Sequence, residues 1–237
     1  KVEMKLCKEY KIGLDYDMYN IFQYYCKNND IKVLDTKFLD KIEVNVYLKG
    51  GEITNAFGGG NNTLVTTTHV YQSGSKVTNL FGGSNAAGNV QTSNITVSGG
   101  ETTNLYGGNN VGGTTATSNI TINNGTVGNA YGGGYSASTT TSNVTVNNGT
   151  ITNVFGGGNK AGVQTTHVNL KGGTITNTYG GSNESGNVNE SNIVTNESST
   201  DLIVQNIYGG NNQGGITNTT NIDLEAGTIT TVYGGGN

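Results

Sequence analysis

A short motif of one aromatic residue followed by two or three glycines recurs along most of this chain. It first occurs as FGGGN at residues 57–61, and variants such as FGGSN, YGGNN and YGGGY lead to YGGGN at residues 233–237. We call the aromatic residues the anchors, and they follow one another at intervals of 24, 25, 25, 24, 24, 29 and 25 residues. The eight anchors are Phe57, Phe81, Tyr106, Tyr131, Phe155, Tyr179, Tyr208 and Tyr233. A repeat of this length indicates a solenoid, in which each copy stacks on the next.

Alignment of the copies on their anchors predicts short strands. Eleven residues before the anchor the seven regular copies have Val or Ile, and Ile193 takes this place in the copy of Tyr208, which has four extra residues. With the copies aligned in this way, the positions nine and four residues before the anchor are mostly apolar, with Gln72, Thr102 and Thr195 as polar departures. Between these columns stand Thr, Asn, Glu or Lys, so the period is two, as in a strand. We expect four inward columns, the fourth being the anchors themselves. Equivalent strands of successive copies then lie parallel, about 4.8 Å apart.

The glycines and asparagines of the repeat have structural explanations. The glycines after each anchor are expected to turn the chain sharply through positive φ and to allow close backbone approach. Asparagines recur two residues before and four residues after most anchors. Because Asn tolerates turns and its amide can pair with an identical amide in the next copy, we expect amide ladders along the coil.

The run T-x-N-[IV]-T-V-x-x-G-T-[IV]-T-N-x-[FY]-G-G-G-N resembles right-handed parallel β-helix proteins of the bacterial surface adhesin and phage tail-spike type. The resemblance covers residues 42–237. It implies an all-β fold, a parallel β-helix solenoid of about eight turns of 24–25 residues. Polysaccharide lyases also use this architecture, so the resemblance implies several alternative roles.

Residues 1–41 have a different composition, with 8 Lys, 7 Asp or Glu and a single glycine. We therefore place a domain boundary between residues 41 and 42. Alternating apolar residues at 2–6 predict a strand and apolar residues at helical spacing over 14–25 predict a helix, so we expect a small α+β segment that caps one end of the coil. Cys7 and Cys26 either form one disulfide or remain two free thiols.

The composition argues against several classes of function. The chain has no arginine and a net charge of -4, which disfavours nucleic acid as a partner. It has no apolar run of 18 residues, so we expect no membrane span. No glycine run has the context of a nucleotide-binding loop, and His69 and His167 are four turns apart, about 19 Å. We expect neither a cofactor nor a bound metal.

Three tyrosines are candidate ligand-binding residues. Tyr47 and Tyr71 both precede their anchors by ten residues, so they should point outward on adjacent turns, and Tyr135 replaces the usual asparagine four residues after its anchor. Exposed aromatic side chains suit sugar rings, although a tyrosine pair beside a cap can also cover the end of the coil.

Carboxylates give the second set of candidates. The one irregular copy carries four extra residues, and Glu190, Glu197 and Asp201 lie near this insertion, where we expect ligand contact or a tolerated loop. Glu52 and Glu101 occupy one column two turns apart, about 9.5 Å, with Lys76 between them. This separation is at the upper limit for an inverting glycosidase, but a charged ladder on a solvated face is the simpler interpretation.

These observations favour a binding module over an enzyme. We expect an extracellular structural or adhesive rod, displayed on a cell or virion surface. It would bind a glycan or protein partner, or associate with itself end to end or as a homo-oligomer. The alternative is a polysaccharide-degrading coil of the tail-spike or lyase type that acts through the carboxylates near the insertion.

Overall fold

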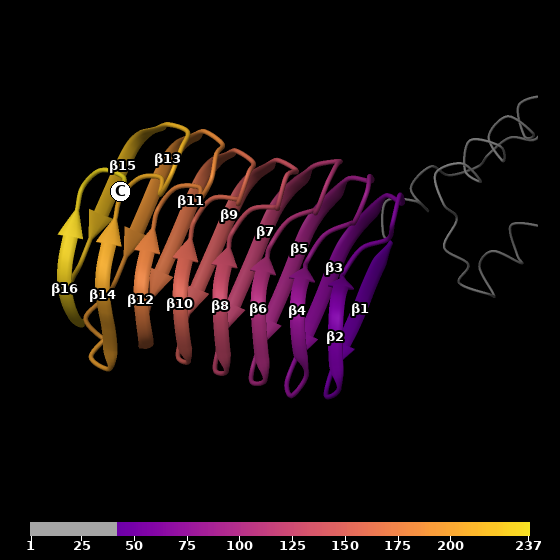
Figure 1. Ribbon diagram of the computed structural model, residues 1–237, viewed down its shortest axis with the longest axis horizontal. Coiled ribbons are helices and arrows are strands. Elements are labelled where there is room, and N and C mark those ends of the chain that lie inside the picture. Colours follow the sequence, from indigo (N-terminus) through magenta and orange to yellow (C-terminus); the bar gives the residue numbers. More distant parts are fainter. Residues whose placement is uncertain (1–41) are drawn as a thin grey trace, which may run out of the picture.

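The computed structural model describes residues 42–237, which form a parallel β-solenoid of about eight turns (Figure 1). The all-β architecture predicted from the repeat is therefore confirmed. The predicted α+β cap and both cysteines lie outside the described residues. Within residues 42–237 there is no helix of the length and apolarity that a membrane crossing requires.

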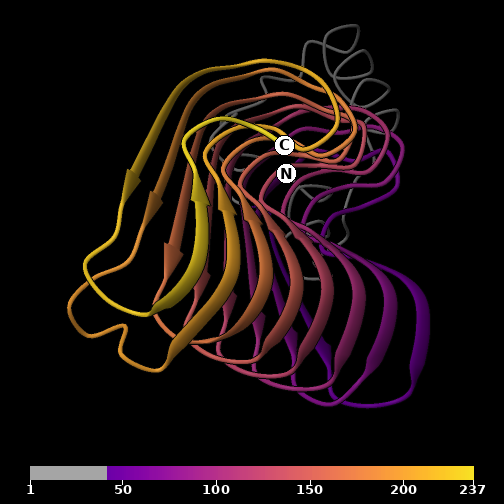
Figure 2. The same cartoon turned by 60° about the vertical axis from the view of Figure 1, so that its left-hand side comes forward.

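Each turn contributes one strand to each of two eight-stranded sheets (Figures 1 and 2). The odd-numbered strands form the first sheet: β1 (Glu43–Leu48), β3 (Val65–Gln72), β5 (Val90–Val97), β7 (Thr115–Ile122), β9 (Thr139–Val146), β11 (Val163–Leu170), β13 (Val188–Val194) and β15 (Thr217–Asp223). The even-numbered strands form the second sheet: β2 (Glu52–Phe57), β4 (Lys76–Phe81), β6 (Glu101–Tyr106), β8 (Thr126–Tyr131), β10 (Thr150–Phe155), β12 (Gly173–Tyr179), β14 (Leu202–Tyr208) and β16 (Thr228–Tyr233). A short turn leads from each odd strand to the next even strand, except between β13 and β14, where the four extra residues lengthen it to residues 195–201, and a long loop leads back from each even strand.

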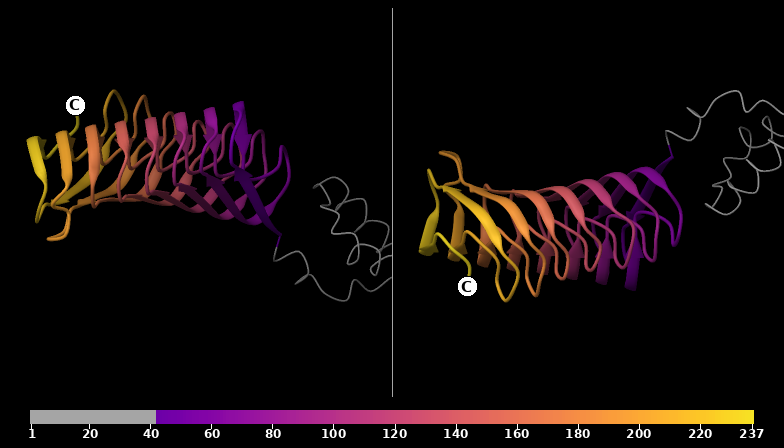
Figure 3. Two further views of the ribbon diagram at one scale, coloured as in Figure 1. Left: turned by 90° about the horizontal axis from the view of Figure 1, so that it is seen from below. Right: turned by 90° about the horizontal axis from the view of Figure 1, so that it is seen from above.

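Equivalent residues of successive turns lie side by side along the whole rod (Figure 3). Every strand pair is parallel, and the register joins like to like, as Val46 with Val70 and Phe57 with Phe81. Backbone hydrogen bonds also link successive long loops, for example from the Asn85 N–H to the Gly60 carbonyl at 3.0 Å. The long loops are therefore stacked layers as regular as the sheets.

The apolar core lies between the two sheets and is made of four columns. Three are the columns predicted eleven, nine and four residues before the anchor. The fourth is the residue immediately before the anchor, for example Leu80, Leu105 and Ile207, which are all fully buried. The prediction that the anchors themselves form the fourth inward column is wrong.

The anchors form a second, separate apolar cluster, because the strand alternation is interrupted just before them. In β4, Val77 and Leu80 both face the core, although they are three residues apart, and the next residue, Phe81, belongs to the aromatic cluster. Two successive residues between Val77 and Leu80 are not buried, which shifts the inward set by one position. The ring at the end of each even strand therefore belongs to a cluster of its own and not to the main core.

Buried hydroxyl groups attach the first sheet to the glycines that follow the anchors. Two residues before the Val or Ile of the first predicted column, seven of the eight copies have Ser or Thr, whose hydroxyl donates to the carbonyl of the first glycine after the anchor of that copy at 2.5–2.7 Å. The donors are Thr68, Ser93, Ser118, Ser142, Thr166, Ser191 and Thr220. A short hydrogen bond of this kind requires the two chain segments to approach closely.

Close approach, and not positive φ, explains the glycine pairs after the anchors. None of these glycines has a positive φ, so that part of the prediction is wrong. A Cβ added at Gly107 would overlap Ser118 Oγ and the Gly132 carbonyl oxygen. Positive φ occurs instead in the short turns, as at Gly125 (φ 108°), and in some long loops, as at Gly113 (φ 73°).

Two of the polar departures in the core columns satisfy each other. Thr102 donates to Gln72 Oε1 at 2.6 Å, and Gln72 Nε2 donates to the carbonyls of Ser75 and Glu101 at 3.0 and 3.1 Å. The third, Thr195, donates to the Ala226 carbonyl at 2.9 Å. Each of these three buried polar side chains therefore has a hydrogen-bond partner, whereas the hydroxyl of Thr178, in the fourth column, has none within residues 42–237.

We expect Gly107→Ala to destabilise the fold by roughly 2–4 kcal/mol, because the added Cβ overlaps its neighbours and displaces the Ser118 hydroxyl. Urea unfolding followed by circular dichroism measures the loss. Gly234→Ala is the matched control, since Gly234 occupies the same repeat position but an added Cβ there meets nothing within 4 Å. Equal losses in the two variants would contradict the close-approach explanation.

Thr102→Val should cost roughly 1–3 kcal/mol, because it leaves the buried Gln72 Oε1 without its donor. The double variant Gln72→Leu with Thr102→Val restores an apolar pair and should recover at least half of that loss in urea unfolding. If the two single losses simply add in the double variant, the pair is not coupled.

Candidate functional site

A groove of about 390 Å³ runs along the long-loop side of the first four turns. We call it the amide-aromatic groove. Its lining residues are Asn55, Phe57, Asn79, Phe81, Asn85, Asn104, Tyr106, Asn110 and Tyr135. None of the nine carries a formal charge, and the volume is within the range of small-ligand sites.

The floor of the groove is part of the continuous stack of anchor rings. Successive centroids are 4.7–4.9 Å apart and successive planes differ by 6–9° over all eight rings. The stack predicted from the repeat is therefore confirmed. Because each ring face is covered by its neighbour, rings such as Phe81 and Tyr106 are only 4% exposed, and the groove meets ring edges.

Two asparagine ladders form the walls. In the first wall Asn79 donates to Asn55 and Asn104 donates to Asn79, at 2.9 and 3.0 Å. In the second wall Asn85 donates to Asn61 and Asn110 donates to Asn85, at 2.8 and 2.9 Å. The expected amide ladders are thus confirmed, and the first continues to Asn206.

Tyr135 ends the groove by breaking the second ladder. Its ring packs edge-on against Tyr106, with centroids 5.7 Å apart and an interplanar angle of 85°. Lys160 Nζ lies 5.3 Å from the Tyr135 ring centroid and 3.3 Å from Glu184 Oε2. The other carboxylate oxygen of Glu184, Oε1, accepts a hydrogen bond from Asn159 Nδ2 at 3.1 Å. Tyr135 thus lies at the junction between the neutral groove and one ion pair.

The anchors that line the groove are two phenylalanines and one tyrosine, Phe57, Phe81 and Tyr106. Asn183 Nδ2 lies 3.4 Å from the Tyr131 hydroxyl, which shows that an anchor hydroxyl reaches the second ladder. Phe57 and Phe81 have no such hydroxyl, and they line the open part of the groove. Beyond Tyr135 the second ladder resumes at Asn159, in the copy whose anchor is Phe155, and continues to Asn183 and onward.

The aromatic stack raises the pKa of several of its hydroxyl groups. Burial raises the pKa of Tyr131 from 10.0 to about 12, although the hydrogen bond from Asn183 acts in the opposite direction. Burial also raises the pKa of Tyr106 and, less strongly, of Tyr179. The hydrogen bond from Asn159 and the nearby Lys160 lower the pKa of Glu184. The Tyr106 hydroxyl, which lines the groove, therefore stays protonated at physiological pH.

The two other candidate tyrosines lie on the outer face of the first sheet. Tyr47 and Tyr71 stack with centroids 5.1 Å apart and an interplanar angle of 13°, and they are 61% and 37% exposed. The expectation that they point outward on adjacent turns is confirmed. His69 lies parallel to Tyr71 and its Nε2 is 3.4 Å from Glu43 Oε1. Neither tyrosine lines the groove, so the structure does not bring Tyr135 together with this pair.

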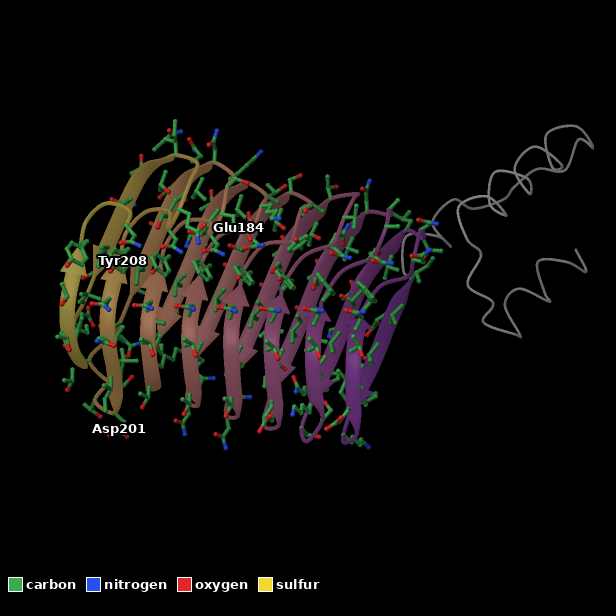
Figure 4. The ribbon with its side chains drawn as sticks, viewed as in Figure 1. Glu184, Asp201 and Tyr208 are labelled. Carbon is green, nitrogen blue, oxygen red and sulfur yellow. The ribbon has the colours of Figure 1, made fainter. Side chains whose placement is uncertain are left out.

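The candidate carboxylates are spread along the irregular turn. Glu190 is on β13 and accepts from Asn221 Nδ2 at 3.4 Å, whereas the Glu197 N–H donates to Glu225 Oε2 at 3.1 Å in the short turn after that strand. The strand from Glu190 to Val194 alone spans roughly 13 Å at 3.3 Å per residue. Asp201 is exposed at the short-turn edge of the rod, opposite Glu184 on the long-loop edge (Figure 4).

The remaining charged candidates occupy the places predicted for them. The register joins Glu52 to Lys76 and Lys76 to Glu101 on the exposed face of the second sheet. His167 is exposed on β11, four turns from His69. In the part of the chain that the structure describes, no three His, Cys, Asp or Glu side chains come together as a metal site would require.

The family comparison matches a part of the chain that lies mostly before the groove residues. A domain of unknown function, DUF1949, matches residues 12–56, of which the described part is β1 and most of β2. This is less than a fifth of the chain, which is too little to assign it to that family. No curated protein and no solved structure matches the chain.

Two further columns of polar residues were missed in the sequence. The hydroxyl column that starts at Thr68 has a clear signal, since Ser or Thr fills that place in seven copies. A third amide ladder, from Asn94 through Asn119 to Asn143, runs on the first sheet in the column that contains the two histidines. The groove itself has no sequence signal, because it depends on the path of the long loops.

The free energy of unfolding should fall as pH rises from about 10 to about 12. The pKa of Tyr131 is higher in the folded chain than the ordinary value of 10.0, so the folded state binds more protons in this window and is favoured less as the proton concentration falls. Urea unfolding at pH 9, 11 and 12 measures the dependence. Tyr131→Phe should show a shallower fall, and an identical fall in the variant would contradict the assignment.

Proposed function

We propose that this chain is a structural, adhesive rod module of a cell or virion surface, which holds a glycan or protein partner by contacts along its side. The extracellular location and the adhesive role are parts of this proposal. Association with a second copy, end to end or side by side, stays a prediction.

The regularity of the rod supports a mechanical role. Backbone hydrogen bonds join every turn to the next in both sheets and in the long loops. Side-chain amides, ring stacks and hydroxyl groups add further contacts in the same direction. A coil that is bonded at every level along its axis is stiff, and its length can be set by the number of copies.

The amide-aromatic groove is the single observation that carries the binding role. It is a long, uncharged hollow with an apolar floor and two rows of amide groups, and no titratable carboxylate or amine is among its lining residues. Such a surface offers hydrogen bonds and apolar contact without the paired acid and base groups that hydrolysis needs.

A polysaccharide-degrading role has less support from the geometry. An inverting or retaining glycosidase needs two carboxyl groups about 5–9.5 Å apart. Glu190 lies on a strand of the first sheet, and Asp201 lies past the end of that strand in the short turn. The described part of the chain therefore separates these two carboxylates.

Incubation with a panel of neutral and acidic polysaccharides tests the proposal, with retention and new reducing ends measured in the same samples. We expect retention by at least one neutral polymer and no increase in reducing ends over a buffer blank. Cleavage that disappears in Glu190→Gln or Asp201→Asn would overturn the proposal in favour of the enzyme. Absence of retention by every polymer would remove the glycan-binding part.

A further inference from the structure

The walls of the amide-aromatic groove carry hydrogen-bonding capacity that the protein does not use. A side-chain amide has two N–H donors and an oxygen with two lone pairs. In the ladders, Asn79 and Asn85 each donate one N–H and accept one hydrogen bond, and no other side-chain hydrogen bond of theirs occurs within residues 42–237. Each wall therefore presents a free donor and a free acceptor per turn.

The floor between the walls has the opposite character. It consists of the edges of Phe57, Phe81 and Tyr106, whose centroids follow one another at 4.8 and 4.7 Å. Ring edges are apolar and carry a weak positive charge on their hydrogens. A ligand that fits must be apolar on the face that meets the floor and polar along both edges.

An extended chain of pyranose sugars joined through equatorial bonds has this distribution of groups. Such a chain is a flat ribbon, with C–H groups on its two faces and hydroxyl groups along its two edges. Hydroxyl groups both donate and accept, so they match amides that offer one donor and one acceptor in every turn. An anionic polymer is less suited, because no Lys is among the lining residues.

We propose that the amide-aromatic groove binds one strand of an uncharged, equatorially linked polysaccharide, lying parallel to the axis of the rod with its hydroxyl groups between the two asparagine walls. This inference rests on the proposed function and names its ligand class and site. Tyr135 closes the groove at the fourth turn and contacts the end of the bound segment.

The Phe and Tyr choice in the anchor column provides a test that leaves the fold intact. Tyr occupies five of the eight anchor positions, so the stack accepts a hydroxyl at Phe81. The Tyr131 hydroxyl lies beside Asn183, a second-ladder residue two turns further along the rod, so a hydroxyl added at residue 81 would extend toward the equivalent residue, Tyr135, at the end of the groove. Phe81→Tyr should therefore narrow the groove.

The experiment measures binding of three soluble hexasaccharides by calorimetry: cellohexaose, which is neutral and flat, maltohexaose, which is neutral and curved, and a hexamer of galacturonic acid, which is charged. We expect cellohexaose to bind best. Phe81→Tyr should weaken it by about tenfold or more, and Phe155→Tyr, in the same column but outside the groove lining, should not.

A second pair of variants tests the amide wall. Asn79→Ala and Asn177→Ala each interrupt the same ladder, but only Asn79 lines the groove. Asn79→Ala should weaken cellohexaose binding by about threefold to tenfold, as expected for the loss of one hydrogen-bonding group, while Asn177→Ala leaves it unchanged. Circular dichroism and urea unfolding of all four variants confirm that they are folded.

The outcomes separate this inference from the proposed function. Cellohexaose binding that is unaffected by Phe81→Tyr and Asn79→Ala, but lost in Tyr47→Ala, would place the glycan on the exposed tyrosine pair and overturn the groove inference alone. Preference for the galacturonic acid hexamer would also overturn it. Failure of the wild-type chain to bind any glycan, in this assay and in the polysaccharide panel, would overturn this inference and remove the glycan-binding part of the proposed function.

Discussion

The stacking of each turn on an equivalent turn is the constraint on which the rest of the structure depends. Parallel strand pairing fixes one repeat distance, close to 4.8 Å, and every side chain must be compatible with its counterpart at that distance. Aromatic rings stack face to face, side-chain amides hydrogen-bond to amides, and branched apolar residues form continuous columns along the rod. Like charges have no such solution, which explains why charged residues are scarce in this part of the chain.

The same constraint explains why glycine is used where it is. The first sheet approaches the long loop so closely that a hydroxyl from Ser118 reaches the Gly132 carbonyl, and the next turn repeats the contact with Ser142 and Gly156. A larger residue after the anchor would separate the two layers and break this contact.

Much of the fold could be predicted from the sequence, because its signals are periodic and local. The Val and Ile column from Val46 to Ile222 predicted the first sheet, and the asparagine columns predicted the amide ladders. The aromatic column was wrongly predicted to face the core. The alternation of inward and outward residues is interrupted between Val77 and Leu80, and the alignment of the copies does not reveal this because every copy has the same interruption. The groove could not be predicted, because it depends on the path of the long loops. The hydrogen bond between Gln72 and Thr102 could not be predicted either, because it requires knowing which columns face each other in the core.

The asparagine ladders give the rod a dipole along its axis. In each ladder bond the later residue donates and the earlier one accepts, as from Asn104 to Asn79 and from Asn110 to Asn85. Dipoles aligned in this way add together, and hydrogen-bonded chains polarise their members further. Within residues 42–237, each ladder has a free amide N–H at its first asparagine and a free amide oxygen at its last one, so its two ends carry opposite partial charges. Molecules that approach the rod along its axis from opposite ends therefore meet opposite partial charges.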